Sequence, residues 1–269
     1  MIKTEMRNPL SINIEKMSTK EMLELIQKEN ENAVKAVDMA IEQIEKACDA
    51  ITKAFEKGGR LFYIGCGTSG RLGILDAVEC PPTYGISQDQ IVGIIAGGRD
   101  SVFKANENKE DSYIDGKNDI RSYSLSKNDI VVGISVSGNA KYVQGALEYA
   151  KSLGCMTIGL TSNSGSVIDI LSDISIVTDT GAEVITGSTR MKAGTAHKIV
   201  LNMLSTCSMI KTGKVYENLM INVKPVNEKL KNRMINIVMQ IFTCTDDKAK
   251  DLLIKYDWNI RHMIDNEGK

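Results

Sequence analysis

The amino-acid sequence predicts an α/β protein: a doubly wound, five-stranded parallel sheet with helices before and after it. Five short runs rich in isoleucine and valine each end in, or are followed by, glycine, serine or threonine. Helix-like segments separate most of these runs, and such alternation is typical of βαβ units. At roughly 150 residues per domain, the chain corresponds to about 1.8 domains, so we expect one large domain with a smaller appendage.

Two helices are expected before the first strand. Ser18-Thr19-Lys20-Glu21 matches a capping box and should begin a helix that runs to about Glu29. Apolar residues at spacings of three and four, from Val34 to Phe55, mark one face of a second helix, which Gly58-Gly59 should end. This apolar stripe indicates packing against the core or against a partner.

The strands follow as continuous apolar runs. Such runs are typical of parallel strands that are buried on both faces, so helices should cover both faces of the sheet. One of these helices is expected from Ala140 to Leu153. The expected strands are Arg60–Ile64, Ile91–Ala96, Ile130–Val136, Met156–Thr161 and Ile174–Thr178.

No strand is expected after Thr189. Long helices are predicted over Met191–Ile210 and Val226–Phe242, and two short ones within Thr245–His262. The predicted domains are an N-terminal helical segment packed on the core (1–58), the α/β domain (59–242) and a short helical C-terminal appendage (243–269).

Charge and composition exclude several classes of function. Lys and Arg total 33 and Asp and Glu total 34, so the near-neutral chain lacks the basic footprint of general nucleic-acid binding. No stretch approaches the roughly 20 apolar residues of a membrane span, and the first residues lack the apolar segment of a secretory signal. Six scattered cysteines indicate reduced thiols of a cytoplasmic protein, and two histidines leave little for a zinc site.

Three loops that follow expected strands are candidates for ligand binding, because ligands of open α/β sheets bind outside the carboxyl ends of the strands. Gly65–Arg71 fits GxGxxG between a strand and a helix, where backbone N–H groups can approach an anion. The other two loops are Ser135–Asn139 and Thr186–Lys192. Hydroxyls and amides from several strand ends favour one compact phosphate over a dinucleotide.

Alternatives remain open at this point. A dinucleotide site needs an acidic residue after the second strand, but that strand ends in Gly97-Gly98-Arg99, which leaves only an NADP interpretation through Arg99. Pattern alone favours solvent-exposed charges for Glu79, next to a Pro81-Pro82 pair expected to end its helix, and for Glu110 in a polar stretch.

Taken together, these motifs resemble the N-acetylmuramic acid 6-phosphate etherases, within the wider sugar isomerase (SIS) family of phosphosugar-binding proteins. The resemblance extends from Thr4-Glu5 to about Asn232. Its most specific segments are Gly67–Gly73, Glu79–Gly85 and Gly187–Thr195.

The resemblance implies the SIS fold and hydrolytic cleavage of the lactyl ether of N-acetylmuramic acid 6-phosphate. The products are N-acetylglucosamine 6-phosphate and D-lactate, in the recycling of cell-wall sugar. It also implies a homodimer with sites near the subunit interface and no metal or organic cofactor.

The two catalytic glutamates of the family fall on Glu79 and Glu110. In the open-chain sugar the C1 aldehyde acidifies the C2 proton, which a base removes while an acid protonates the departing lactyl oxygen. Water then adds at C3. Two carboxyl groups can perform these steps if their environments separate their pKa values. We expect Glu110 to be the base and Glu79 the acid.

Hydroxyls and amides of the loops, with one added charge, should bind the phosphate. One loop departs from the family pattern, because Asn139 stands where an arginine usually follows the glycine. A non-catalytic phosphosugar sensor and an aldose–ketose phosphosugar isomerase stay open as alternatives, and neither would release lactate. The expected substrate-binding residues are Gly67, Thr68, Ser69, Ser137, Gly138, Ser188 and Lys192.

Overall fold

The computed structural model describes residues 2–268, with Glu107 described by its backbone alone. One five-stranded parallel sheet has the order β2-β1-β3-β4-β5. This is a doubly wound order with its switch point between β1 and β3. The strands are β1 (Leu61–Gly65), β2 (Ile91–Ile95), β3 (Ile130–Ile134), β4 (Met156–Thr161) and β5 (Ile174–Val177), which confirms the predicted fold class.

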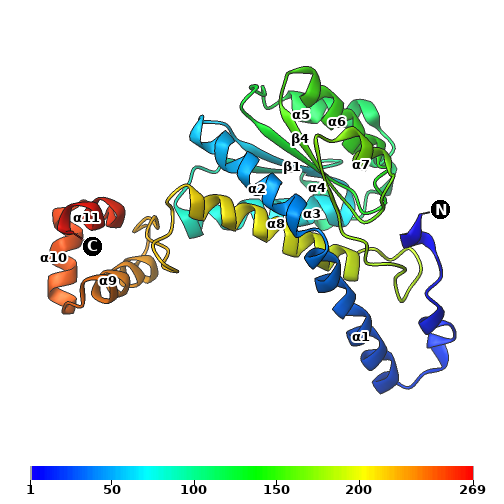
Figure 1. Ribbon diagram of the computed structural model, residues 1–269, viewed down its shortest axis with the longest axis horizontal. Helices are drawn as coiled ribbons and strands as arrows, with labels where there is room; N and C mark the ends of the chain where they lie inside the picture. Colours follow the sequence, from blue (N-terminus) through cyan, green and yellow to red (C-terminus); the bar gives the residue numbers. More distant parts are fainter. Residues whose placement is uncertain (1, 269) are drawn as a thin grey trace.

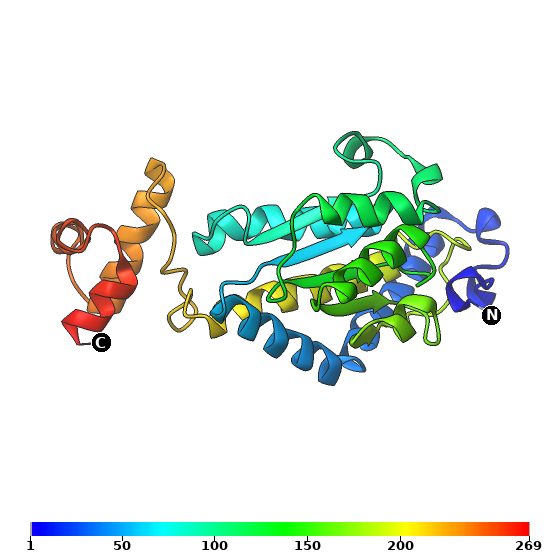
Figure 2. The same ribbon diagram turned by 90° about the horizontal axis from the view of Figure 1, so that it is seen from above.

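Helices cover both faces of the sheet (Figures 1 and 2). The inner strand β1 is buried along its whole length, with Leu61 and Tyr63 in one apolar layer and Phe62 and Ile64 in the other. The first layer contains α2 (Ile41–Glu56), α3 (Gly67–Tyr84) and α8 (Lys192–Lys211). The second contains α5 (Tyr113–Arg121), α6 (Lys141–Ser152) and α7 (Val167–Leu171).

The N-terminal helix α1 (Thr19–Asp38) is longer than predicted. Its capping box is present, because the Ser18 hydroxyl accepts a hydrogen bond from the Glu21 amide and the Glu21 carboxylate accepts one from the Ser18 amide. The helix does not end near Glu29, since no glycine or proline interrupts residues 19–38. Three short 3₁₀ turns precede it and lead the chain from beside the sheet domain to the start of α1 (Figure 1).

Helix α3 also differs from the prediction, because Pro81 and Pro82 lie inside its last turn and do not end it. The Thr83 hydroxyl donates to the Glu79 carbonyl at 2.7 Å. The helix ends at Gly85, which has a φ of +62° and donates its amide to the Pro81 carbonyl. The left-handed conformation that closes this helix costs least for glycine.

The last three helices, α9 (Glu228–Phe242), α10 (Asp246–Lys255) and α11 (Ile260–Glu267), form a separate group beside the sheet domain (Figure 1). Met234 and Val238 of α9 share one buried cluster with Leu253 and Met263. Packing therefore groups α9 with α10 and α11, while the domain boundary at residue 243 stays a prediction. Within residues 2–268, no helix combines the length and apolarity needed to cross a membrane.

Candidate active site

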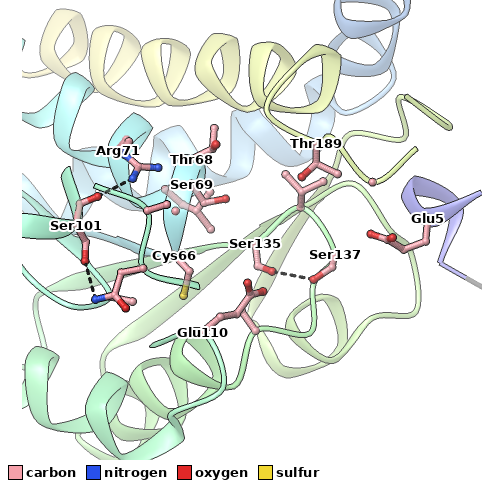
Figure 3. A pocket seen from close by; sticks show the side chains of 18 residues that line it. Glu5, Cys66, Thr68, Ser69, Arg71, Ser101, Glu110, Ser135, Ser137 and Thr189 are labelled. Atoms are coloured by element: carbon pink, nitrogen blue, oxygen red, sulfur yellow. Dashed lines mark hydrogen bonds between the residues drawn. The ribbon is translucent and has the colours of Figure 1, made fainter. Parts of the chain in front are cut away.

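A polar cavity of about 430 Å³ lies at the carboxyl ends of β1 and β3 (Figure 3). The start of α3 contributes Gly67–Ser69, the loop after β3 contributes Ser135 and Ser137, and the loop before α8 contributes Gly187 and Thr189. All three loops that the sequence singled out therefore meet at one edge of the sheet, because the carboxyl ends of parallel strands lie together.

The first turn of α3 leaves several hydrogen-bond donors at the cavity. Within the described chain, the amides of Gly67, Thr68 and Ser69 have no acceptor, and neither do the two hydroxyls. The first amides of a helix lack intrahelical partners and form the positive end of its dipole. Glycine makes the tight turn possible, because a Cβ on Gly70 would lie 2.6 Å from the carbonyl oxygen of Gly65. A phosphate fits this arrangement.

Arg71 adds a positive charge to the same end of the cavity. Its Nε and Nη2 atoms donate to the carbonyls of Ser101, Val102 and Lys104 at 2.7 to 3.0 Å, which holds the segment after β2 in place. Among the described residues, its Nη1 has no acceptor and no carboxylate pairs with the guanidinium. This charge is therefore available to an anionic ligand.

The loop after β3 is fixed by its own hydroxyls. The Ser135 and Ser137 Oγ atoms lie 3.3 Å apart, and Ser135 Oγ accepts the Gly138 amide at 3.1 Å. Gly138 has a φ of +73°, and a Cβ there would lie 2.0 Å from Ser166 Oγ, so only glycine fits. Asn139 donates its Nδ2 to the Ser137 carbonyl at 3.2 Å and thus stabilises the loop rather than adding charge.

Glu110 reaches the cavity from the segment between β2 and α5. Its carbonyl accepts the amide of Tyr142, which anchors this segment to the start of α6. Its carboxylate lies beside Cys66 (Figure 3). Burial, and next the charge of Glu110, raise the pKa of the Cys66 thiol. The thiol therefore stays protonated at neutral pH and is a poor nucleophile.

Curated relatives cover almost the whole chain. It is 49% identical over 252 residues to the N-acetylmuramic acid 6-phosphate etherase of Pasteurella multocida, which covers 94% of this chain and 84% of that protein. The etherase of Clostridium botulinum is 50% identical over 261 residues, covering 97% of this chain and 86% of the relative. The chain belongs to the N-acetylmuramic acid 6-phosphate etherase family.

Other comparisons agree with the fold of the etherase family. Residues 119–206 match the SIS domain, and residues 43–151 match the glucokinase regulatory protein N-terminal SIS domain. The phosphoheptose isomerase of Neisseria gonorrhoeae superposes with a TM-score of 0.54 at 19% identity, over 71% of this chain and 98% of that one. The phosphoheptose isomerase of Francisella tularensis superposes with a TM-score of 0.52 at 17% identity, over 72% of this chain and 100% of that one. These likenesses show the SIS fold.

Some of the site residues predicted from the etherase resemblance line the cavity, and others do not. Gly138 and Ser188 belong to its loops without lining it, and the Ser188 amide is bonded to the Ile185 carbonyl. Sequence reasoning gave no role to Glu5 and Arg71, although both lie in segments that resemble the etherases. The predicted residues that line the cavity are Gly67, Thr68, Ser69, Glu110 and Ser137.

Lys192 does not line the cavity and is 2% exposed. Its Nζ pairs with the buried carboxylate of Glu29 in α1, which also accepts Asn8 Nδ2 at 2.7 Å. The Glu183 carboxylate accepts the amides of Lys192 and Ala193 at 3.4 and 3.0 Å and so caps α8. This buried network joins the N-terminal segment, α1, the loop before α8 and α8 itself.

Glu79 is exposed and lies outside the cavity of its own chain. At about 1.5 Å per residue it stands roughly 16 Å further along α3 than Thr68. It shares the exposed side of α3 with Leu75 and Val78, which are 47% and 57% exposed.

His197 lies in the middle of α8 and is fully buried, with Nε2 3.3 Å from Ser162 Oγ. Burial lowers its pKa to about 4, so the ring is neutral at pH 7. His262 lies in α11, away from the sheet domain. Over the part of the chain that the structure describes, no three His, Cys, Asp or Glu side chains gather closely enough to hold a metal ion.

Proposed function

We propose that this protein cleaves the lactyl ether of N-acetylmuramic acid 6-phosphate, giving N-acetylglucosamine 6-phosphate and D-lactate in the recycling of cell-wall sugar. The near-50% identity to etherases over 94% and 97% of the chain carries this proposal. The cavity supports it, because it combines donors for a phosphate with the carboxylate of Glu110.

In this proposal the first turn of α3 binds the phosphate. The unpaired amides of Gly67–Ser69, the Thr68, Ser69 and Ser137 hydroxyls and the charge of Arg71 neutralise it locally. Gly138 and Ser188 set the shape of the two neighbouring loops. Lys192 acts indirectly, since its ion pair with Glu29 fixes the loop before α8.

Glu110 is proposed as the base. It takes the proton from C2 of the open-chain sugar, the C2–C3 double bond forms, and the C3–O bond to lactate breaks as the ether oxygen receives a proton. Water then adds across the double bond, with hydroxide at C3 and a proton at C2. Glu79 is proposed as the acid that protonates the departing oxygen.

A second copy of the chain is proposed to bring Glu79 to the site. An isologous contact repeats the same surface on both copies. If α3 packs antiparallel on its partner's α3 about Leu75, Glu79 lies opposite the partner's Arg71, about one helical turn from the start of that helix. Leu75 and Val78 would form the apolar centre of this contact. A composite site of this kind accounts for a catalytic glutamate that is absent from the cavity of its own chain.

An apolar groove between α2 and α8 supports the proposed homodimer. Ile44, Met203 and Ile210 line it with few polar atoms, and α8 also packs against α3. The groove therefore lies on the helix next to α3, and in this proposal it extends the contact. A cytoplasmic location is proposed as well, because all six cysteines are free thiols.

The test is to incubate the protein with N-acetylmuramic acid 6-phosphate and measure D-lactate. Wild-type protein should release it, and Glu110→Gln should reduce the rate by about 10² to 10⁴, the range for a general base. Glu148→Gln, an exposed acid on α6 outside the cavity, is the matched control and should keep the wild-type rate.

The assignment of base and acid is tested by exchange of the C2 proton with deuterium from the solvent. Glu79→Gln should retain exchange without lactate release, while Glu110→Gln should lose both. The opposite pattern would reverse the two roles. Phosphosugar binding without lactate release by wild-type protein would support a sensor, and aldose–ketose interconversion would support an isomerase.

A further inference from the structure

A second carboxylate, that of Glu5, also lies in the cavity, supplied by the N-terminal segment (residues 2–8). Glu5 ends the short turn Lys3–Glu5, and its carboxylate packs against Gly187. A Cβ on Gly187, which has a φ of +74°, would lie 3.2 Å from Glu5 Oε2. Glycine at this position therefore leaves room for the glutamate at the wall of the cavity.

The backbone on both sides of Glu5 is held in place. The Lys3 amide donates to Asn163 Oδ1 at 2.9 Å, and Asn163 Nδ2 donates to the buried hydroxyl of Thr4 at 3.1 Å. On the other side, Asn8 Nδ2 donates to Glu29 Oε2 at 2.7 Å and to the carbonyl of residue 182 at 3.1 Å. This fixation lowers the entropy that a ligand would lose in ordering the carboxylate.

The Glu5 carboxylate makes no hydrogen bond or ion pair with any other described residue. The carboxylate is thus a hydrogen-bond acceptor that is held at the cavity wall without a partner among the described residues. Figure 3 shows Glu5 and Arg71 on opposite sides of the cavity, with Glu110 between them. A phosphate should bind at the Arg71 end, since it is repelled by a carboxylate and attracted by a guanidinium.

This polarity orients a sugar 6-phosphate in the cavity. If the phosphate binds at the first turn of α3, as proposed, C2 and C3 would face Glu110 and the C1 end would extend toward Glu5. In the closed ring, C1 carries a hydroxyl that can donate to a carboxylate. Elimination needs the aldehyde form, so the ring must open before Glu110 can act.

We propose that Glu5 opens the sugar ring. Its carboxylate takes the proton of the C1 hydroxyl, the O–H electrons form the C1=O bond, and the C1–O5 bond breaks as O5 receives a proton from water. Glu5 then returns its proton to the solvent. The orientation of the sugar in this inference rests on the proposed function, but the ring-opening step can be measured without lactate release.

The experiment follows the exchange between the α and β anomers of N-acetylglucosamine 6-phosphate by NMR, with full-length protein. Wild-type protein and Glu110→Gln should both accelerate this exchange, because ring opening does not need the C2 base. Glu5→Gln should lower the acceleration at least about tenfold, as expected for loss of a general base. Glu5→Asp should recover part of it.

Glu15→Gln is the matched control, an exposed acid of the same N-terminal region that does not line the cavity. It should behave as the wild type. Inhibition of lactate release by inorganic phosphate should be the same for Glu5→Gln and wild type, which shows that the phosphate end is intact. Acceleration by Glu5→Gln equal to the wild type, or no acceleration by the wild type, would overturn the proposal. Anomer exchange without lactate release would instead contradict the etherase function alone.

Discussion

His197 shows at the scale of one residue how burial sets a charge. Its side chain is fully buried in α8, close to Ser162, and burial lowers its pKa from 6.5 to about 4. In the unfolded chain the His197 ring takes up a proton near pH 6.5, whereas in the folded protein it stays neutral until about pH 4. Folding stability therefore falls as the pH drops through this window.

The free energy of unfolding should accordingly fall by about 2 kcal/mol from this group between pH 7.5 and pH 5. Urea unfolding at the two pH values measures the difference. His197→Gln removes the titrating ring. The free energy of unfolding of this variant should therefore fall by about 2 kcal/mol less than that of the wild type between pH 7.5 and pH 5. An identical pH dependence in the variant would contradict the assigned burial effect.

The cavity glutamates show what the sequence could say about single residues. Resemblance to a family singled out Glu110, for which pattern alone predicted a solvent-exposed charge. Its side chain is exposed and also lines the cavity. Glu5 had no comparable signal, because its place in the cavity depends on contacts of the neighbouring Lys3 and Thr4 with Asn163, which lies far along the chain. Local patterns do not report contacts between distant segments.

At the scale of elements, the pair of Lys192 and Glu29 connects α8 to α1. Both side chains are buried, so removing one leaves the other charge without a partner in a poorly solvated place. The network also holds Asn8 and therefore the segment that carries Glu5. A lysine that the sequence suggested for the phosphate thus lies where it supports the walls of the cavity.

Lys192→Met should lower the free energy of unfolding by roughly 3 to 5 kcal/mol, because Glu29 is left buried and unpaired. The double variant Lys192→Met with Glu29→Met should recover most of this loss. Urea unfolding measures both. If Lys192 instead binds phosphate directly, the single variant would keep its stability and lose inhibition by inorganic phosphate.

The ends of strands and helices show which boundaries local sequence patterns predict and which they do not. The strands were predicted closely, because buried parallel strands are short apolar runs. The predicted end of α3 was wrong. The two prolines were expected to end the helix, but its last turn accommodates them and the helix ends at Gly85. The end of α1 was wrong for the opposite reason, as nothing in residues 19–38 interrupts the helix.

At the scale of the whole molecule, Glu79 and Glu110 lie at separate places on one chain. The side chain of Glu79 lies on the exposed face of α3, outside the cavity that holds Glu110. The exposed apolar residues Leu75 and Val78 lie beside it on the same face. In the proposed homodimer, each site uses Glu110 of one copy and Glu79 of the other.

Co-expression of Glu79→Gln and Glu110→Gln copies should therefore restore lactate release to two inactive variants. Half of randomly paired dimers are mixed, and each mixed dimer has one site with both glutamates intact. The expected activity is about a quarter of the wild-type value. Each variant expressed alone is the control, and a mixture as inactive as its parts would show that Glu79 does not act across a dimer.

The sequence by itself determined the order of strands and helices, the glycine-rich turn at the start of α3 and the motifs that carry the family resemblance. These features depend on residues close together in the chain, because periodicity and turn chemistry act locally. Only the tertiary structure placed Glu5 in the cavity, turned Lys192 toward Glu29 and left Glu79 on an exposed face. Those positions depend on packing between elements distant in the chain, which no local pattern specifies.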